Sequence, residues 1–218
     1  MRLSAAGAVL RLLLAATAGL AEAGPRTDAG AIAFVSDRET TVADAPINEI
    51  YLLNPQTRQV HRLTHDLPGV ERWPTISPDG RALAWVRWVV DEAGSPRPDL
   101  AEIYRCDLRS RAGTPSCHNP RKVIGPVFDN VITWTADSRS ILYSGSVNAD
   151  GDADIYTVDV HSRRTTNLTH EAVVDGTLVQ NNQPTVAPNG RSFVYSRSGG
   201  PTAPTCTAAA STAPIRRS

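Results

Sequence analysis

The sequence predicts an all-β fold: a β-propeller with an incomplete arc of about three to four four-stranded antiparallel blades. Three motifs recur along the 218-residue chain with a common period, and each describes part of the same unit. A repeat of about fifty residues with four short strands has the size and strand content of one propeller blade. The shared period of three independent motifs is the main support for this prediction.

The first motif is a hairpin whose turn contains an acid or amide followed by glycine or serine. It occupies residues 74–81 (PTISPDGR), recurs at residues 184–191 (PTVAPNGR), and has a diverged copy at residues 132–139 (ITWTADSR). Proline presets φ for such a turn, and glycine accepts the positive φ that closes it. An alternating apolar strand follows each turn, as expected of a second hairpin arm. The predicted turn residues are Pro78, Asp79, Gly80, Asp137, Ser138, Pro188, Asn189 and Gly190.

Two further motifs follow the hairpin in each repeat. An acid, an isoleucine and a tyrosine stand together at residues 49–51, 102–104 and 154–156. Residues 62–66 (RLTHD) return two periods later as residues 167–171 (NLTHE). The unit is therefore a hairpin, an Ile-Tyr strand, and a strand that ends in Leu-Thr.

These motifs resemble the WD-like repeat of the TolB-like β-propeller family. The resemblance rests on Ser-Pro-Asp-Gly-Arg before an aliphatic-aromatic strand, on Asp/Glu-Ile-Tyr and on Arg-Leu-Thr, and it covers residues 31–197. It implies a propeller of about six blades. This sequence accounts for two full blades, one blade without its first strand and one without its last two strands.

Residues 1–23 are predicted to form a signal peptide. Arg2 provides a basic start, residues 12–16 an apolar run, and the small-x-small cleavage site ends at Ala23. Arg11 interrupts the apolar stretch, which is therefore too short to span a membrane. An N-terminal helix of the mature protein is the alternative. Cleavage after this segment would place the protein in the periplasm or outside the cell.

The remaining chain divides into a linker, the propeller and a tail. Residues 24–30 are the expected linker, and residues 31–197 the partial propeller. The longest insertion within a repeat is a predicted loop over residues 88–101. Propeller insertions lie at one end of the ring, where binding surfaces form, although a tolerated solvated loop is an equal alternative. Residues 198–218 are rich in Thr, Ala, Pro and Ser without periodicity, and we expect them to be disordered.

The second blade contains a candidate disulfide. Cys106 and Cys117 flank residues 107–116, which we interpret as the turn between its third and fourth strands. Facing positions on a hairpin bring Cβ atoms near bridging distance. A disulfide is favoured over two free thiols in an exported protein, and Cys206 in the tail is the odd cysteine.

One acidic segment of the third blade has the spacing of a calcium loop. Asp150, Asp152 and Asp154 stand at alternate positions around Gly151. The twelve-residue loop with its terminal bidentate Glu is missing. A polar turn is therefore the favoured interpretation, and we expect no metal site.

The sequence carries no catalytic or cofactor motif. His-x-x-x-His, Cys-x-x-Cys, Gly-x-Ser-x-Gly and the glycine-rich phosphate loop are all absent. His65 and His170 occupy equivalent repeat positions, which indicates a structural role in turns. The 22 basic and 22 acidic residues argue against a nucleic-acid or anionic-membrane partner recognised by bulk charge. We therefore expect no cofactor and no catalytic residue.

Two classes of function fit the predicted fold. The first is a non-catalytic exported scaffold that binds a protein or a carbohydrate in the bacterial cell envelope. The alternative is the propeller fragment of an enzyme, because similar repeats precede the catalytic domain of prolyl-oligopeptidase-like hydrolases and form the body of some polysaccharide lyases. The scaffold is favoured, since a hydrolase needs a Gly-x-Ser-x-Gly domain and a lyase a cluster of metal-binding histidines.

Overall fold

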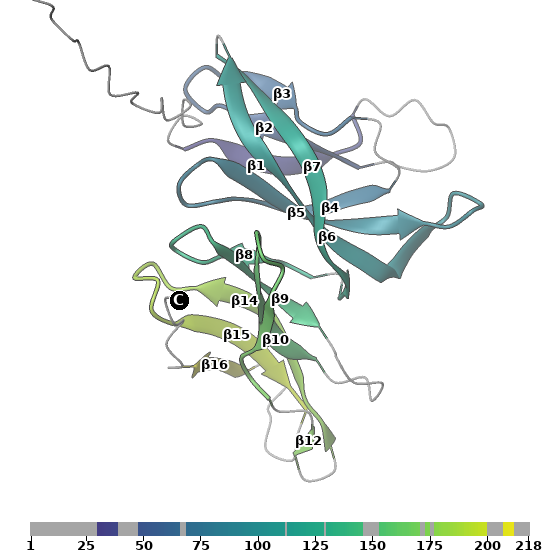
Figure 1. The fold of residues 1–218 in the computed structure, drawn as a ribbon, viewed down its shortest axis with the longest axis vertical. Coiled ribbons are helices and arrows are strands. Elements are labelled where there is room, and N and C mark those ends of the chain that lie inside the picture. The colour runs from purple at the N-terminus through teal and green to yellow at the C-terminus, as the bar shows by residue number, and fades with distance from the viewer. Residues whose placement is uncertain are drawn as a thin grey trace, which may run out of the picture.

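The computed structural model confirms the all-β propeller fold. It describes residues 30–38, 48–65, 69–111, 113–128, 130–145, 153–170, 173–174, 177–199 and 207–211. The strands form antiparallel sheets that follow one another along an arc (Figure 1). No helix in this part of the chain is long and apolar enough to cross a lipid bilayer. The predicted signal peptide at residues 1–23, Cys206, Asp150 and Asp152 lie outside the described residues.

Four of the sheets correspond to four blades. Blade 1 contains β1 (Ile32–Ser36), β2 (Glu49–Leu53) and β3 (Val60–Arg62), and blade 2 contains β4 (Val70–Ile76), β5 (Ala82–Val90), β6 (Pro96–Arg111) and β7 (Thr114–Val127). Blade 3 contains β8 (Thr133–Trp134), β9 (Ser140–Gly145), β10 (Asp154–Asp159) and β11 (Thr165–Asn167). Blade 4 contains β14 (Gln180–Val186), β15 (Phe193–Ser198) and β16 (Thr207–Ser211). A separate hairpin pairs β12 (Val173–Val174) with β13 (Thr177–Leu178).

The end of the chain differs from the expectation of a disordered tail over residues 198–218. Strand β16 lies within that segment and pairs antiparallel with β15, from Phe193 opposite Ser211 to Arg197 opposite Thr207. Blade 4 therefore has three strands instead of the expected two. The edge of β15 supplies backbone hydrogen-bonding groups, so a run of small residues without apolar periodicity can still add as a strand.

Blade 2 has longer strands than expected. Strands β5 and β6 continue through most of the predicted loop over residues 88–101 and leave only residues 91–95 between them. Strands β6 and β7 likewise extend to Arg111 and Thr114, so most of the predicted turn at residues 107–116 is strand. Most residues of these extensions are half-buried or exposed, and they show no regular apolar alternation although the backbone ladder continues.

The repeated turns share one hydrogen-bonding pattern. Gly80, Ser138 and Gly190 each donate a backbone N–H to the carbonyl three residues earlier, at 2.8, 2.9 and 2.8 Å, and their φ angles are 71°, 61° and 67°. The side chain two residues before each arginine accepts that arginine's N–H. The pairs are Asp79 with Arg81 (3.1 Å), Asp137 with Arg139 (3.1 Å) and Asn189 with Arg191 (2.9 Å). An acid or amide recurs here because its side-chain oxygen bonds the backbone of the turn.

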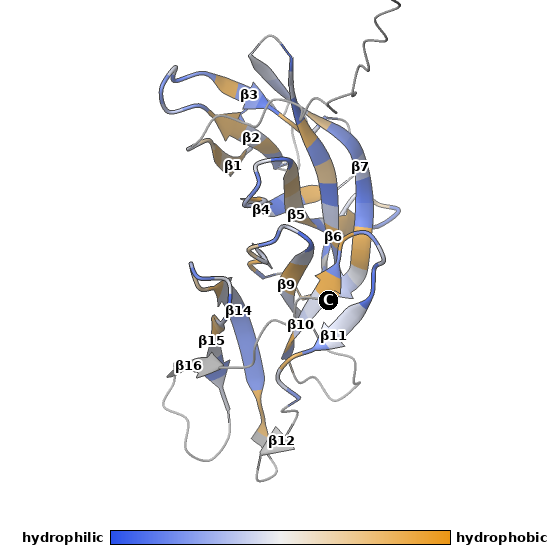
Figure 2. Cartoon of the chain, turned by 60° about the vertical axis from the view of Figure 1, so that its left-hand side comes forward, coloured by the Kyte–Doolittle hydropathy of each residue, from blue (hydrophilic) through white to orange (hydrophobic). Residues whose placement is uncertain are grey.

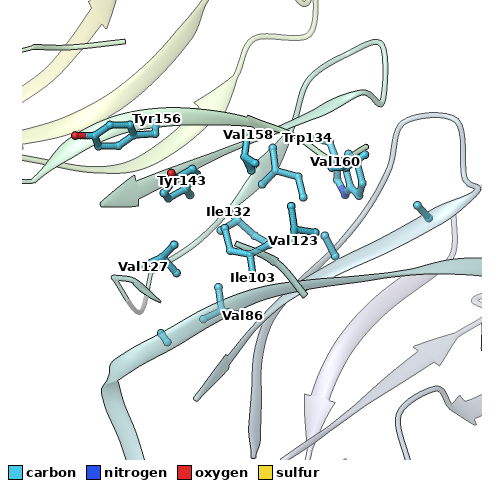
Figure 3. Packing of buried hydrophobic residues seen from close by; sticks show 14 residues of the cluster. Val86, Ile103, Val123, Val127, Ile132, Trp134, Tyr143, Tyr156, Val158 and Val160 are labelled. Atoms are coloured by element: carbon cyan, nitrogen blue, oxygen red, sulfur yellow. The ribbon is translucent and has the colours of Figure 1, made fainter. Parts of the chain in front are cut away.

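The blades pack face to face because successive residues of a strand point to opposite faces of its sheet. On β5, Leu83 and Trp85 lie in the core shared with blade 1, whereas Ala84 and Val86 lie in the core shared with blade 3. Figure 3 shows Val86, Ile103 and Val127 of blade 2 in one core with Tyr143, Tyr156 and Val158 of blade 3. A third core joins Leu142 and Ile155 of blade 3 to Phe193 and Tyr195 of blade 4.

An aromatic pair crosses the middle of blades 1, 2 and 3. In each pair the two residues are direct register partners on neighbouring strands, and their ring centroids lie 5.6 to 5.9 Å apart. The pairs are Phe34 with Tyr51, Trp85 with Tyr104 and Tyr143 with Tyr156. Cross-strand aromatic pairs stabilise a sheet beyond the area they bury, which gives the tyrosine of the Ile-Tyr motif a structural role.

Buried hydrogen bonds connect the second motif to the third. In blade 1 the Thr64 hydroxyl donates to the Glu49 carboxylate and accepts the N–H of Ile50 at 2.9 Å. In blade 3 Thr169 makes the same two bonds with Asp154 and with the N–H of Ile155, the latter at 3.1 Å. The acid of one motif and the threonine of the other are therefore a single structural unit.

The acid also binds a side chain of the fourth strand in blades 1, 2 and 3. Glu49 accepts from Arg62 at 2.7 Å, Glu102 from Lys122 at 2.8 Å, and Asp154 from Asn167 at 2.7 Å. In each blade this bond ties the third strand to the fourth. It explains why an acid opens the Ile-Tyr motif in every repeat.

Replacing Thr64 by valine tests this unit. The change keeps the shape of the side chain but removes the hydroxyl that serves both Glu49 and the Ile50 N–H, and both groups are buried. We expect a loss of about 1–3 kcal/mol in the free energy of unfolding, measured by urea denaturation. The exposed Thr57→Val is the matched control, and an equal effect of both changes would contradict the assignment.

A disulfide bond joins Cys106 of β6 to Cys117 of β7, with a Cα–Cα distance of 5.5 Å. Because it closes a short loop, the double change Cys106→Ala and Cys117→Ala should cost about 2–3 kcal/mol of stability. Non-reducing peptide mapping of the native protein should recover the two cysteines in one linked fragment. Alkylation of both thiols without reduction would rule the bond out.

Candidate functional site

The first strands of blades 2, 3 and 4 border a cavity of about 380 Å³. Its lining comes from equivalent repeat positions, none of them charged: Thr75, Ile76 and Pro78 of blade 2, Thr133, Trp134 and Ala136 of blade 3, and residues 186–188 of blade 4. Strands β4, β8 and β14 therefore converge on one hollow, as the innermost strands of a propeller do. We call them the inner strands.

Polar contacts between blades hold the inner strands at one end of this cavity. The indole N–H of Trp134 in blade 3 donates to the Thr75 carbonyl of blade 2 at 3.1 Å. The backbone N–H of Asp79 donates to the Ser138 hydroxyl at 3.1 Å. Two of the predicted turn residues thus meet across the blade interface. We call this the turn end of the propeller, because the three repeated turns lie there.

Farther from the turn end, in the middle of each strand, β4 and β14 contain a bulge before a proline. The pairing register shifts between Arg72 and Thr75 in β4 and between Asn182 and Thr185 in β14. Trp73 and Gln183, at equivalent positions, have φ angles of 50° and 54°. Positive φ is uncommon for residues other than glycine, and its recurrence makes this bulge a property of the repeat. The sequence motifs do not predict this bulge, although the proline within the strand is a usable signal.

Arg72 lies against two tryptophan rings beside this bulge. Its guanidinium carbon is 4.5 Å from the ring centroid of Trp88 and 5.2 Å from that of Trp73. Such cation–π contacts hold the side chains in fixed relative positions. Trp73 keeps 37% of its surface exposed, which is unusual for so large an apolar residue on an inner strand.

Amide side chains occupy the equivalent repeat positions in blades 3 and 4. Asn130, just before β8, donates through Nδ2 to Oδ1 of Asn182 on β14 at 3.2 Å, and Gln183 beside it is exposed. Figure 2 shows β14 as a mainly hydrophilic strand. We define the inner rim as five residues from two adjacent repeat positions. They are Arg72, Asn130 and Asn182 at the first position, and Trp73 and Gln183 at the second.

A buried ion pair between β4 and β5 lies next to the rim residue Arg72. Glu71 and Arg87 face each other on β4 and β5 at 2.9 Å, with side chains only 1% and 6% exposed. Arg87 also lies 4.0 Å from the ring centroid of Tyr104. Burial raises the pKa of the Glu71 carboxyl to about 7, because desolvation outweighs the attraction of Arg87 and the neighbouring Glu49 carboxylate raises it further.

Several exposed apolar side chains lie at the end where residues 91–95 join β5 to β6, which we call the hairpin end. Leu100 precedes Ala101 on β6, Phe128 follows β7 and bonds Ser144 through its N–H, and Leu178 lies against Gly199 at the end of β15. Together with Trp73 they are 37–40% exposed. Val60, which is 39% exposed, instead begins β3 at the turn end.

The histidines and the acidic residue singled out from the sequence lie in turns and strands, where Asp154 and His170 make local hydrogen bonds. His65 and His170 are exposed, and the N–H of His170 donates to Oδ1 of Asn167 at 3.2 Å in a turn with positive φ. The Asp154 carboxylate accepts bonds from Thr169 and Asn167. Within the described ranges, no group of three or more His, Cys, Asp or Glu side chains could hold a metal ion.

Comparison with known proteins agrees with this architecture. No family model matches the sequence. TolB from Acinetobacter baumannii superposes with a TM-score of 0.60 at 20% identity, over 85% of this chain and 39% of that one. The fold is therefore that of a TolB-like β-propeller, present here as a partial arc.

Enzymes are also among the similar proteins. Dipeptidyl-peptidase 5 from Porphyromonas gingivalis is 27% identical over 124 residues, which are 55% of this chain and 16% of that protein. A puromycin-hydrolyzing peptidase from Mycobacterium tuberculosis superposes with a TM-score of 0.48 at 17% identity, over 77% of this chain and 25% of that one. The chain thus spans well under half the length of each of these proteins.

The Glu71 carboxyl should make stability depend on pH. Its pKa of about 7 in the folded state exceeds the ordinary 4.5, so the folded protein binds more protons between these values and loses stability as pH rises through them. We expect a fall on the order of 3 kcal/mol across this range. Glu71→Gln should flatten the profile measured by urea denaturation, whereas Glu102→Gln should not. An unchanged slope in Glu71→Gln would show that another group titrates.

Proposed function

We propose that this protein is a non-catalytic binding scaffold, exported to the periplasm or beyond, which holds a protein or carbohydrate partner of the cell envelope at the hairpin end. The observation that carries the proposal is the set of exposed apolar side chains at this end: Trp73, Leu100, Phe128 and Leu178. We interpret these side chains, which blade 2 and the hairpin beside blade 4 contribute, as parts of one interaction surface.

The architecture supports this role. Strands β5 and β6 continue beyond the body of blade 2 and form a hairpin that projects from the stack of sheets (Figure 1). Loops and hairpins on a rigid scaffold are common binding elements, because the scaffold pays little entropy on association. The buried ion pair between Glu71 and Arg87 lies in this blade, next to Trp88 at the base of the hairpin.

A second candidate is the propeller portion of a peptidase, and the identity to dipeptidyl-peptidase 5 favours it. In that case the propeller would position a substrate for a catalytic nucleophile carried elsewhere. Calorimetric titration of the purified full chain with dipeptide substrates distinguishes the two candidates. The peptidase candidate predicts saturable binding of the dipeptides, whereas the scaffold proposal predicts none.

Affinity capture from envelope extracts tests the scaffold proposal directly. The full chain with the changes Leu100→Ser and Phe128→Ser should retain at least tenfold less of the captured partner than the unchanged protein. Because a Phe or Leu side chain at a contact surface contributes apolar burial, replacing two of them removes well over a tenfold factor in affinity.

Val60→Ser is the matched control, because Val60 is equally exposed but lies at the turn end. It should leave capture unchanged. Equal capture by all three proteins, or an equal loss in the control, would overturn the assignment of the binding surface. Thermal unfolding of each variant verifies that the fold is intact.

A further inference from the structure

We propose that the inner rim is a binding site for a neutral carbohydrate chain. The proposal rests on the proposed function, since it names the ligand class that the scaffold would hold at this end of the inner strands. It is carried by the composition of the rim: one exposed tryptophan, three carboxamides and one arginine whose guanidinium already lies against indole rings.

Trp73 provides the apolar part of the site. A sugar ring presents a face of C–H groups that packs flat against an indole, and Trp73 keeps more than a third of its surface exposed for such a contact. The bulge sets its backbone at a φ of 50°, and Arg72 lies against its ring. The side chain is therefore positioned before any ligand arrives, which lowers the entropic cost of binding.

The carboxamides provide the polar part. Each Asn or Gln side chain offers two N–H donors and a carbonyl acceptor, and this combination matches adjacent sugar hydroxyls, which both donate and accept. Asn130 and Asn182 are linked by one hydrogen bond at 3.2 Å that orients both groups. Gln183 is exposed on the equivalent of the Trp73 bulge.

The charges near the rim favour a neutral ligand. Arg72 is the rim's single charged residue, and the neighbouring Arg87 is neutralised by Glu71 at 2.9 Å. The cavity of about 380 Å³ between the inner strands also has an uncharged lining. A polyanionic ligand would find one guanidinium without a cluster of cations around it, which is too little for strong charge recognition.

The inner strands are poorly suited to the main alternative, an extended peptide. Peptides commonly bind by adding a strand to a regular sheet edge. Here β4 and β14 each carry a bulge followed by a proline, Pro74 or Pro184, at the middle of the strand. A bulge bends the edge and proline lacks an N–H, so the ladder that a peptide strand needs is interrupted.

The test is titration of the full-length protein with four neutral hexasaccharides: maltohexaose, cellohexaose, mannohexaose and chitohexaose. Calorimetry and tryptophan fluorescence measure the dissociation constant of each. At least one should bind, and Trp73→Ala should weaken that binding at least tenfold. Trp73→Phe, which keeps an aromatic face, should retain part of the affinity. Asn182→Ala should also weaken binding, and Val60→Ser should have no effect.

Three outcomes would overturn the proposal: no binding by any hexasaccharide, binding that Trp73→Ala leaves unchanged, or tighter binding of neutral hexapeptides assayed in parallel. Thermal unfolding and the near-ultraviolet spectrum of each variant separate loss of the site from loss of the fold. If the saccharides fail while capture from envelope extract still depends on Leu100 and Phe128, the inference fails and the scaffold function stands. If capture fails as well, both fail.

Discussion

The structure depends on face-to-face packing of the blades, in which the central strands of blades 2 and 3 bury both of their faces. Strand β5 shows the constraint most clearly, since residues 83–86 are all fully buried although they point alternately into two different cores. A fully buried Trp85 and the small Ala84 on opposite faces let blades 1 and 3 approach the same sheet. A charged residue at any of these positions would separate two blades rather than disturb one.

Polar units at the strand ends complement these apolar cores. Glu49 with Thr64, and Asp154 with Thr169, satisfy backbone groups where the third strand begins, and they lie next to the inner strand of the following blade. The N–H of Glu71 donates to the Asn48 carbonyl, and the N–H of Asn181 makes the equivalent bond to Ala153. The inner strands are thus fixed at both ends, which gives the rim a rigid support.

Local chemistry made much of this fold predictable. The turns at Gly80 and Gly190 follow from residues whose conformational preferences are strong, and the period of the motifs specifies how many blades are present. The extension of β6 and β7 was not predictable in the same way, because their exposed residues show no alternation. Strand β16 was missed for a related reason: its pairing depends on the edge of β15, which only the folded chain provides.

The sequence by itself determined the repeat, the strand order within a blade and the turn residues, because each depends on neighbours within about fifty residues. Only the tertiary structure decided which side chains meet across blades. Asn130 and Asn182 are 52 positions apart, and Trp134 of blade 3 donates to the Thr75 carbonyl of blade 2 across 59 positions. The candidate site is built from such contacts, because the inner strands converge only when the blades stack about a common axis.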